Sequence, residues 1–130
     1  MDDPRQCRLL PAVVVVAAIS VVCAGCQPVS ADKQEAYSGD AANGRRLADA
    51  YGCGACHFIP GVPGARGEAG PSLRHMGRRG YIAGRAPNTE TNMVRWLLRP
   101  HSIAPDTAMP DVGLERAQAR DIAAFLRTLE

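Results

Sequence analysis

The stretch YGCGACHFIPG, residues 51–61, contains the most distinctive pattern in this 130-residue chain. Cys53 and Cys56 stand three positions apart, and His57 follows the second cysteine directly. Such a trio can bind a metal ion, cycle between dithiol and disulfide, or attach a prosthetic group covalently. Each kind of site needs different partners elsewhere in the chain, so the rest of the sequence decides between them.

A structural zinc site and a redox-active dithiol both fit the sequence poorly. Structural zinc needs four ligands, but no second cysteine pair accompanies Cys53, Cys56 and His57 in this part of the chain. A thioredoxin-like dithiol follows a strand in a βαβ unit, and no strand of convincing period precedes Cys53. The C-x-x-C-H pattern is typical of covalent haem attachment. Both thiols would add to the haem vinyl groups, and His57 would bind the iron.

A haem iron has a second axial position, for which the sequence offers several residues. Met109 is favoured because it lies in an irregular segment between two predicted helices, held by Pro105 and Pro110. A thioether is a weak ligand, so it must be held rigidly against the iron. The other candidates have alternative explanations, namely core packing for the methionines and a capping or surface position for the histidines. They are Met76, Met93, His75 and His101.

The N-terminal segment predicts export. Residues 1–8 are polar with two arginines, and residues 9–22 form a 14-residue apolar run, which is short for a membrane span and typical of a secretory signal. The run is followed by CAGC ending at Cys26, which resembles a bacterial lipobox, although Cys23 stands where such motifs usually carry leucine. We expect a signal peptide over residues 1–25 and a lipid on Cys26, with an uncleaved anchor helix as the alternative.

Net charge and composition limit the functions that can be expected of the exported chain. The part before Cys26 holds two basic and two acidic residues, so its removal leaves the net charge at +2. This mild balance gives no indication of nucleic-acid binding. Residues 26–38 are polar without an apolar period and predict a flexible linker. Residues 39–130 then form one domain, whose small core would gain from a bulky apolar group at its centre.

Helical patterns dominate the predicted domain. Asp40 is a good N-cap for a helix that ends near Tyr51, and Asn88 is a possible N-cap for a second helix that ends before Pro100. The glycines of residues 61–71 predict an irregular loop between them. The last helix has one apolar stripe at positions i, i+3, i+4 and i+7, formed by Ile122, Phe125, Leu126 and Leu129.

The order of these features resembles that of the class I cytochromes c. The matching stretches cover about residues 39–130 and read GDAANG, CGACH, GPSL, WLLRP, AMP and DIAAFL. The resemblance implies an all-α fold, in which three to four helices surround one covalently bound haem c. The domain would be preceded by the signal peptide and the flexible tether.

Several residue roles follow from this resemblance. Pro71 would accept a hydrogen bond from His57 Nδ1, which would fix the tautomer of the imidazole and make it a better donor to the iron. Gly44 would let the first helix pack closely against Phe125. Trp96 would lie near the Met109 side of the haem.

A closer likeness is carried by GCGACHFIPGVPG and PNTETNMVRWLLRPHSIAPDTAMPDVGL. These stretches resemble the cytochrome c domain that is fused to subunit II of some bacterial haem–copper oxidases. No fused copper-binding domain is recognisable in the sequence, and the predicted lipid tether stands in its place. The stretch GPSLRHMGRRG is also rich in arginine, so both Arg78 and Arg79 are candidates for holding a haem propionate.

The resemblance implies an electron carrier rather than an enzyme, because His57 and Met109 together would leave no open position on the iron. Methionine ligation raises the reduction potential, which favours a respiratory role toward a terminal haem–copper oxidase. The expected partners are membrane redox complexes, either a terminal oxidase or a cytochrome bc complex, with no nucleic acid and no small-molecule substrate. The domain would be lipid-anchored on the periplasmic side of the cell membrane.

Two alternatives to a mobile carrier stay open. The chain could be a fixed cytochrome c subunit of an oxidase or dehydrogenase complex. It could also react with a gas or a peroxide if Met109 dissociates readily from the iron.

The predicted lipid anchor can be tested at Cys26. Cys26→Ser removes the thiol that would carry the lipid, so the domain should leave the membrane fraction and still bind haem. Membrane fractionation followed by haem staining measures both properties. A variant that stays with the membranes would instead indicate that residues 9–22 form an uncleaved anchor helix.

Overall fold

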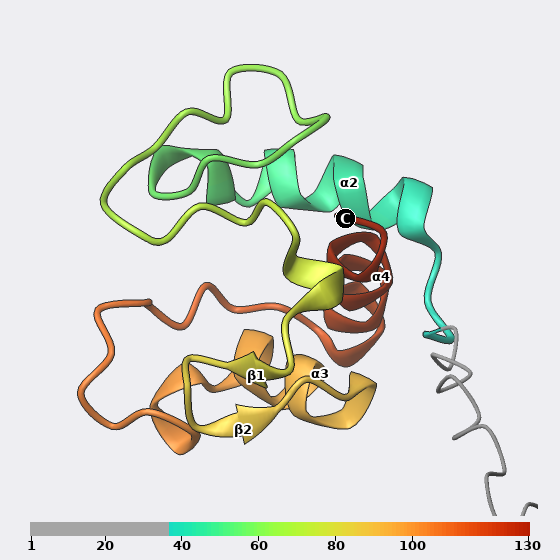
Figure 1. Ribbon diagram of the computed structural model, residues 1–130. Coiled ribbons are helices and arrows are strands. Elements are labelled where there is room, and N and C mark those ends of the chain that lie inside the picture. The colour runs from blue at the N-terminus through green and yellow to red at the C-terminus, as the bar shows by residue number, and fades with distance from the viewer. Residues whose placement is uncertain (1–36) are drawn as a thin grey trace, which may run out of the picture. The chain divides into compact units, whose positions relative to one another are not determined.

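The computed structural model describes residues 37–130 (Figure 1). The predicted signal peptide over 1–25, the acylated Cys26 and the predicted linker up to residue 36 lie outside the described residues and stay predictions. The described part is mostly helical, which confirms the predicted all-α class. None of its helices is both long enough and apolar enough to cross a bilayer.

Within residues 37–130, the fold consists of three α-helices and three short 3-10 helices. The α-helices are α2 (Ala41–Ala50), α3 (Glu90–Leu98) and α4 (Arg116–Arg127). The 3-10 helices are η1 (Cys53–Ala55), η2 (Met76–Arg78) and η3 (Pro100–Ser102). Two-residue strands, β1 (Tyr81–Ile82) and β2 (Ala86–Pro87), pair as a small antiparallel hairpin. The sequence does not predict this hairpin, because strands so short have no readable period.

Side chains satisfy the free amides at the start of α2 and α4. Asp40 is the N-cap of α2, as the sequence predicts, and its Oδ1 accepts from two amides of the first turn at 2.9 and 3.1 Å. At the start of α4, Glu115 and Gln118 form a reciprocal capping box. All four residues of the predicted apolar stripe are buried in the core, although Leu129 lies just beyond the end of α4.

The start of α3 differs from the prediction. Its N-cap is Thr89, whose Oγ1 accepts from the Asn92 amide at 3.3 Å. The side chain of Asn88, the expected N-cap, instead forms hydrogen bonds outside the helix. Its side-chain amide donates to the carbonyls of Met76 and Arg79, both at 2.9 Å. Asn88 therefore ties the start of α3 to η2, a contact between loops that helix-capping rules cannot predict.

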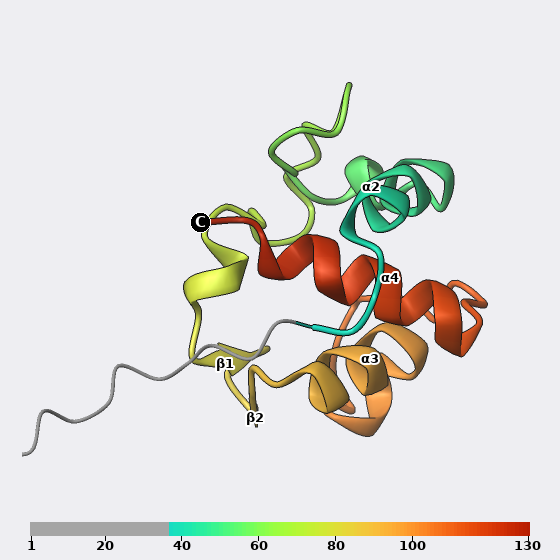
Figure 2. The same cartoon turned by 90° about the vertical axis from the view of Figure 1, so that its right-hand side faces the viewer.

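The first and last described α-helices cross at close range. Figure 1 shows α2 from the side and α4 end-on, whereas Figure 2 shows α4 lengthwise. Gly44 lies at the crossing, where an added Cβ would overlap the backbone of Asp121 and Ile122. The resemblance implies that Gly44 lets the first helix pack closely against the last, and the nearest part of α4 is the backbone of Asp121, one turn before Phe125.

The Asp121 carboxylate reinforces this crossing. Its oxygens accept from the Asp40 amide at 2.8 Å and from Asn43 Nδ2 at 2.7 Å. These bonds join residues 81 and 78 positions apart. The two ends of the domain are therefore held together by hydrogen bonds as well as by apolar packing.

Tyr37, two residues before the predicted boundary, already contacts the domain. The Tyr37 hydroxyl donates to the Asn88 carbonyl at 3.2 Å, and the Arg127 guanidinium lies 5.8 Å from the centre of the Tyr37 ring. Burial raises the pKa of the Tyr37 hydroxyl, so it stays a neutral donor. Ser38 adds a hydrogen bond from its amide to Glu90 at 3.1 Å. The chain thus enters the domain alongside the first turn of α3.

The helix crossing can be tested by adding one methyl group. Gly44→Ala should lower the free energy of unfolding by about 1–3 kcal/mol, the usual cost of overpacking, because backbone atoms of α4 occupy the space of the new Cβ. The matched control is Gly80→Ala, since no atom lies within 4 Å of a Cβ added there. Thermal unfolding of both holoproteins measures the difference. Equal midpoints for the two variants would contradict the close packing.

Candidate haem site

A cavity of about 350 Å³ opens in the domain and is lined mainly by apolar side chains. Its walls come from all three α-helices, from η2, from β1 and from the loops between them. The structure brings the six residues that the sequence predicts for the haem site to this one cavity. They are Cys53, Cys56, His57, Pro71, Trp96 and Met109.

Cys53 begins the 3-10 helix η1 that follows α2, and Cys56 is the C-cap of this helix. Gly52 precedes it in the left-handed region, at φ 69°, where glycine is favoured, and this reverses the chain after α2. The amides of Cys56 and His57 both donate to the Cys53 carbonyl, at 3.3 and 3.0 Å. This tight turn presents both thiols and the imidazole to the same cavity. Neither cysteine forms a disulfide.

The two thiols differ in their surroundings. Cys53 is half-buried against the core, and this burial raises the pKa of its thiol. Cys56 is exposed. Cys53 therefore lies on the core side of the cavity, and Cys56 marks the side that faces solvent.

The imidazole of His57 has a fixed hydrogen-bond partner. His57 Nδ1 lies 2.7 Å from the Pro71 carbonyl oxygen, which can only accept, so Nδ1 carries the proton. The other ring nitrogen, Nε2, is then left with the lone pair that a metal requires. The Pro71 contact expected from the resemblance is thus present in the geometry.

Gly70 is a site residue that the sequence analysis did not single out. Its amide donates to the Cys56 carbonyl at 2.7 Å, and a Cβ at this position would overlap the His57 ring. Only glycine lets the backbone pass so close to the imidazole. The G-P pair in GPSL contains this glycine, but the resemblance assigned a role to the proline alone.

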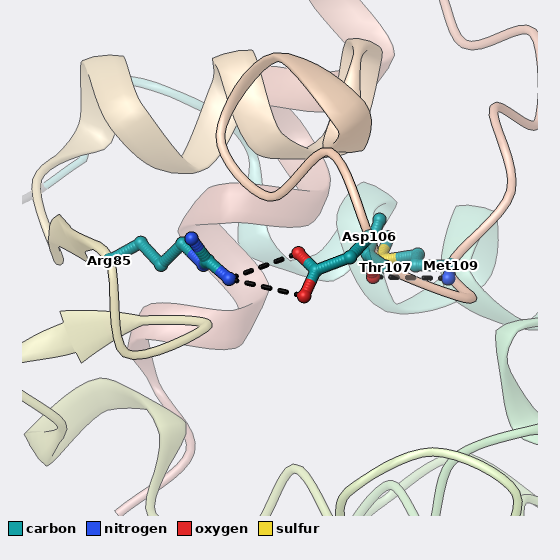
Figure 3. A network of polar contacts seen from close by, with 4 residues as sticks. All are labelled: Arg85, Asp106, Thr107 and Met109. Atoms are coloured by element: carbon teal, nitrogen blue, oxygen red, sulfur yellow. Dashed lines mark hydrogen bonds and ion pairs between the residues drawn. The ribbon is translucent and has the colours of Figure 1, made fainter.

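Three methionines line the cavity, so a place in its wall does not by itself identify the one that would bind the iron. Met76 and Met93 are buried, at 6% and 2% exposure, and belong to η2 and α3. Met109 is half-buried and comes from the irregular segment between η3 and α4. Its amide donates to Thr107 Oγ1 at 3.2 Å, which fixes the local turn (Figure 3). The remaining candidates, His75 and His101, are exposed and do not line the cavity.

Arg79 is the arginine that reaches the cavity. It lines the wall, whereas Arg78 does not. Arg79 Nη2 donates to the carbonyls of Ser72 at 2.6 Å and Arg74 at 3.1 Å, and these bonds hold the guanidinium at the rim. The sequence could not choose between the two arginines because they are adjacent, and the turn of η2 decides which one points inward.

Residues 41–130 match the sequence model of the protein family described as "Cytochrome c". This chain belongs to the cytochrome c family. A relative named cytochrome c oxidase subunit 2, from Alkalihalophilus pseudofirmus, is 31% identical over 105 residues. The match covers 78% of this chain and 29% of the relative, so the chain spans less than a third of that protein's length. No solved structure matches.

Family membership establishes the cofactor and the broad function of this cytochrome c. It carries covalently bound haem c and transfers electrons. The residues of the cavity fit that group. Two thiols lie on one turn, an imidazole has its Nδ1 satisfied, and the walls are apolar. Arg79 is the only arginine, lysine or carboxylate among the lining residues of the described part, and it can face the anionic edge of a haem.

The hairpin supplies part of the wall that the sequence analysis missed. Tyr81, Ile82 and Ala83 all line the cavity. Ile82 is buried at 1% exposure, whereas Tyr81 is the exposed large apolar side chain of the described residues, at 62%. The available signal was Gly84, which takes the left-handed conformation that the turn requires at φ 67°.

Covalent attachment can be tested by removing both thiols. The double variant Cys53→Ala, Cys56→Ala should show no haem band on a denaturing gel, because no sulfur remains for a thioether. The apo chain should also lose cooperative unfolding, since a domain this small would have an empty cavity at its centre. Met76→Leu is the control, because it changes the same wall and spares the thiols. A normal haem band in the double variant would contradict the assignment.

Proposed function

We propose that this cytochrome c carries single electrons in a membrane-associated respiratory chain, with His57 and Met109 as the axial ligands of its haem. The observation that carries the proposal is the meeting of these two side chains at one apolar cavity. His57 is oriented by Pro71, and Met109 comes from the half-buried irregular segment. The bound haem supplies the one-electron redox chemistry.

The chain's own residues set the conditions for that chemistry. The Pro71 carbonyl accepts a hydrogen bond from the proton-bearing Nδ1 of His57, which orients the ring, points Nε2 at the cavity and makes the imidazole a stronger donor. The methionine thioether favours the reduced state and raises the potential. Apolar walls exclude water from the ligands and strengthen this effect. Two protein ligands would leave no open position, so the site would transfer electrons without binding a substrate.

Arg79 is proposed to hold a haem propionate. Its guanidinium already donates to two backbone carbonyls, so it is positioned at the cavity rim before any anion binds. An arginine fixed in this way loses little side-chain freedom on binding a carboxylate. Arg78 lacks this position and is not proposed for the role.

The electron acceptor is proposed to be a terminal haem–copper oxidase, with a cytochrome bc complex as the donor. Support comes from the relative, which is named a subunit of cytochrome c oxidase. A lipid on Cys26 would keep the domain on the periplasmic face of the cell membrane. A flexible linker of about a dozen residues spans roughly 20 Å, so it would hold the domain close to membrane complexes and raise its effective concentration there.

A fixed subunit is the second candidate function. The favouring observation is that the relative is itself a subunit of an enzyme complex, and that this chain matches 29% of it. A fixed subunit would co-purify with the complex in mild detergent at a constant ratio. A tethered carrier would separate from it at high salt.

The ligand assignment can be tested by exchanging Met109 for histidine. Met109→His should keep the iron six-coordinate and lower the reduction potential, because imidazole favours the ferric state more than a thioether does. Axial ligands move haem potentials over a range of about 0.8 V, and each 59 mV changes a one-electron equilibrium tenfold. A redox titration of the purified holoprotein measures the shift.

Met76→Leu and Met93→Leu are the matched controls, because both methionines line the same cavity. We expect each to titrate close to the wild type. The assignment would be wrong if Met109→His kept the wild-type potential while one of these two variants shifted it.

A further inference from the structure

The segment that carries Met109 is long and lacks regular structure. It runs over residues 103–115, between η3 and α4. Its first two residues, Ile103 and Ala104, are buried, and Leu114 near its other end packs partly against the core. The middle of the segment is mostly exposed. Met109 is the part of this middle that packs on the core.

Most hydrogen bonds of this segment are local. The Thr107 amide donates to the Ala104 carbonyl at 3.1 Å, and the Met109 amide donates to Thr107 Oγ1 at 3.2 Å. The Gly113 amide donates to Asp111 Oδ1 at 2.9 Å. Such bonds shape each turn, but they do not hold the segment against the rest of the domain.

One ion pair makes the connection that the local bonds do not. Arg85 Nη2 lies 3.0 Å from Asp106 Oδ1 and 3.2 Å from Oδ2 (Figure 3). Within residues 37–130, it is the only hydrogen bond or ion pair that joins the segment to an element distant in sequence. Asp106 lies directly before Thr107, whose hydroxyl caps the Met109 amide. The acidic partner of the ion pair therefore lies three positions before Met109 in the chain.

The arginine comes from a part of the fold with a fixed geometry. Arg85 follows Gly84 in the turn between β1 and β2, and its amide donates to the Ile82 carbonyl at 2.9 Å. Ile82 is buried, and Ala83 in the same turn lines the haem cavity. The ion pair thus links two walls of the cavity, the hairpin and the Met109 segment.

We propose that the Arg85–Asp106 ion pair positions Met109, an inference that rests on the proposal that Met109 is the sixth ligand. The pair is present when the segment lies against the cavity and is lost when the segment moves away. It therefore shifts the equilibrium toward the ligated state. Arg85 and Asp106 are positioning residues, because they act on the iron through the Met109 segment.

The expected effect is small but measurable. The side chains of Arg85 and Asp106 are 53% and 75% exposed, and exposed ion pairs change an equilibrium by at most about fivefold. A thioether is a weak ligand, so an external ligand can compete with it directly. A variant that shifts the equilibrium between the ligated and the displaced position of the segment therefore changes the apparent affinity for the competitor by the same factor.

Imidazole titration of the ferric holoprotein tests the proposal. Asp106→Asn and Arg85→Gln should each lower the imidazole concentration at half-displacement, by up to about fivefold. The double variant should be no weaker than either single variant, because both remove the same interaction. The reversed pair, Arg85→Asp with Asp106→Arg, should recover part of the loss. Salt at about 1 M, where the Debye length is about 3 Å, should bring the wild type toward the variants.

Asp111→Asn and Arg95→Gln are the matched controls. Asp111 lies in the same segment and bonds only to the Gly113 amide, a bond that the asparagine oxygen can keep. Arg95 is exposed on α3 and forms no ion pair among the described residues. Both controls should bind imidazole as the wild type does. The proposal is overturned if the Asp106 and Arg85 variants match these controls, or if their effects add in the double variant.

The same experiment separates this inference from the proposed ligand. Wild-type ferric protein should show the long-wavelength absorption band of thioether ligation, and Met109→His should abolish it. If the band is absent, or survives in Met109→His, the ligand assignment fails and the positioning role fails with it. If the band depends on Met109 but the ion-pair variants bind imidazole normally, only the positioning role fails.

Discussion

The hydrogen bond between His57 Nδ1 and the Pro71 carbonyl is the contact on which the site depends. It orients the imidazole, and it also fixes where the loop after the cysteine motif must run. Gly70 then has to pass against the ring, which leaves no room for a Cβ. Leu73 continues the attachment, since its amide donates to the Phe58 carbonyl at 2.9 Å. One wall of the cavity is thus built from a loop that follows the ring rather than from a helix.

The opposite wall is assembled from parts that are individually weak. A hairpin of two-residue strands is marginal in water by itself, and the Met109 segment has no ladder of backbone bonds. Each gains order from the core, through Ile82 in one case and Ile103 in the other. The redox centre of this cytochrome c therefore combines a firmly held histidine side with a methionine side whose order rests on a few contacts.

The sequence predicts the parts of this fold that depend on local rules. Asp40 caps its helix, the α4 stripe is buried, and the residues of the C-x-x-C-H motif meet Pro71 at one cavity. The errors concern contacts between distant segments. Thr89 replaces Asn88 as the N-cap of α3 because Asn88 bonds to η2, and the hydrogen bond from Asn43 to the Asp121 carboxylate is missed. Local spacing contains no information about either contact.

The α2–α4 crossing also bears on when this domain can fold. Gly44 and Asn43 find their partner in Asp121, 78 positions after Asn43, so the first helix has no complete packing surface until α4 has been synthesised. Contacts between such distant residues form late, because the closure of a long loop must come first. An unfinished chain would therefore stay open, with the thiols of Cys53 and Cys56 accessible. The close approach of the two helices thus links completion of this fold to the presence of α4, which follows the cysteine motif in the chain.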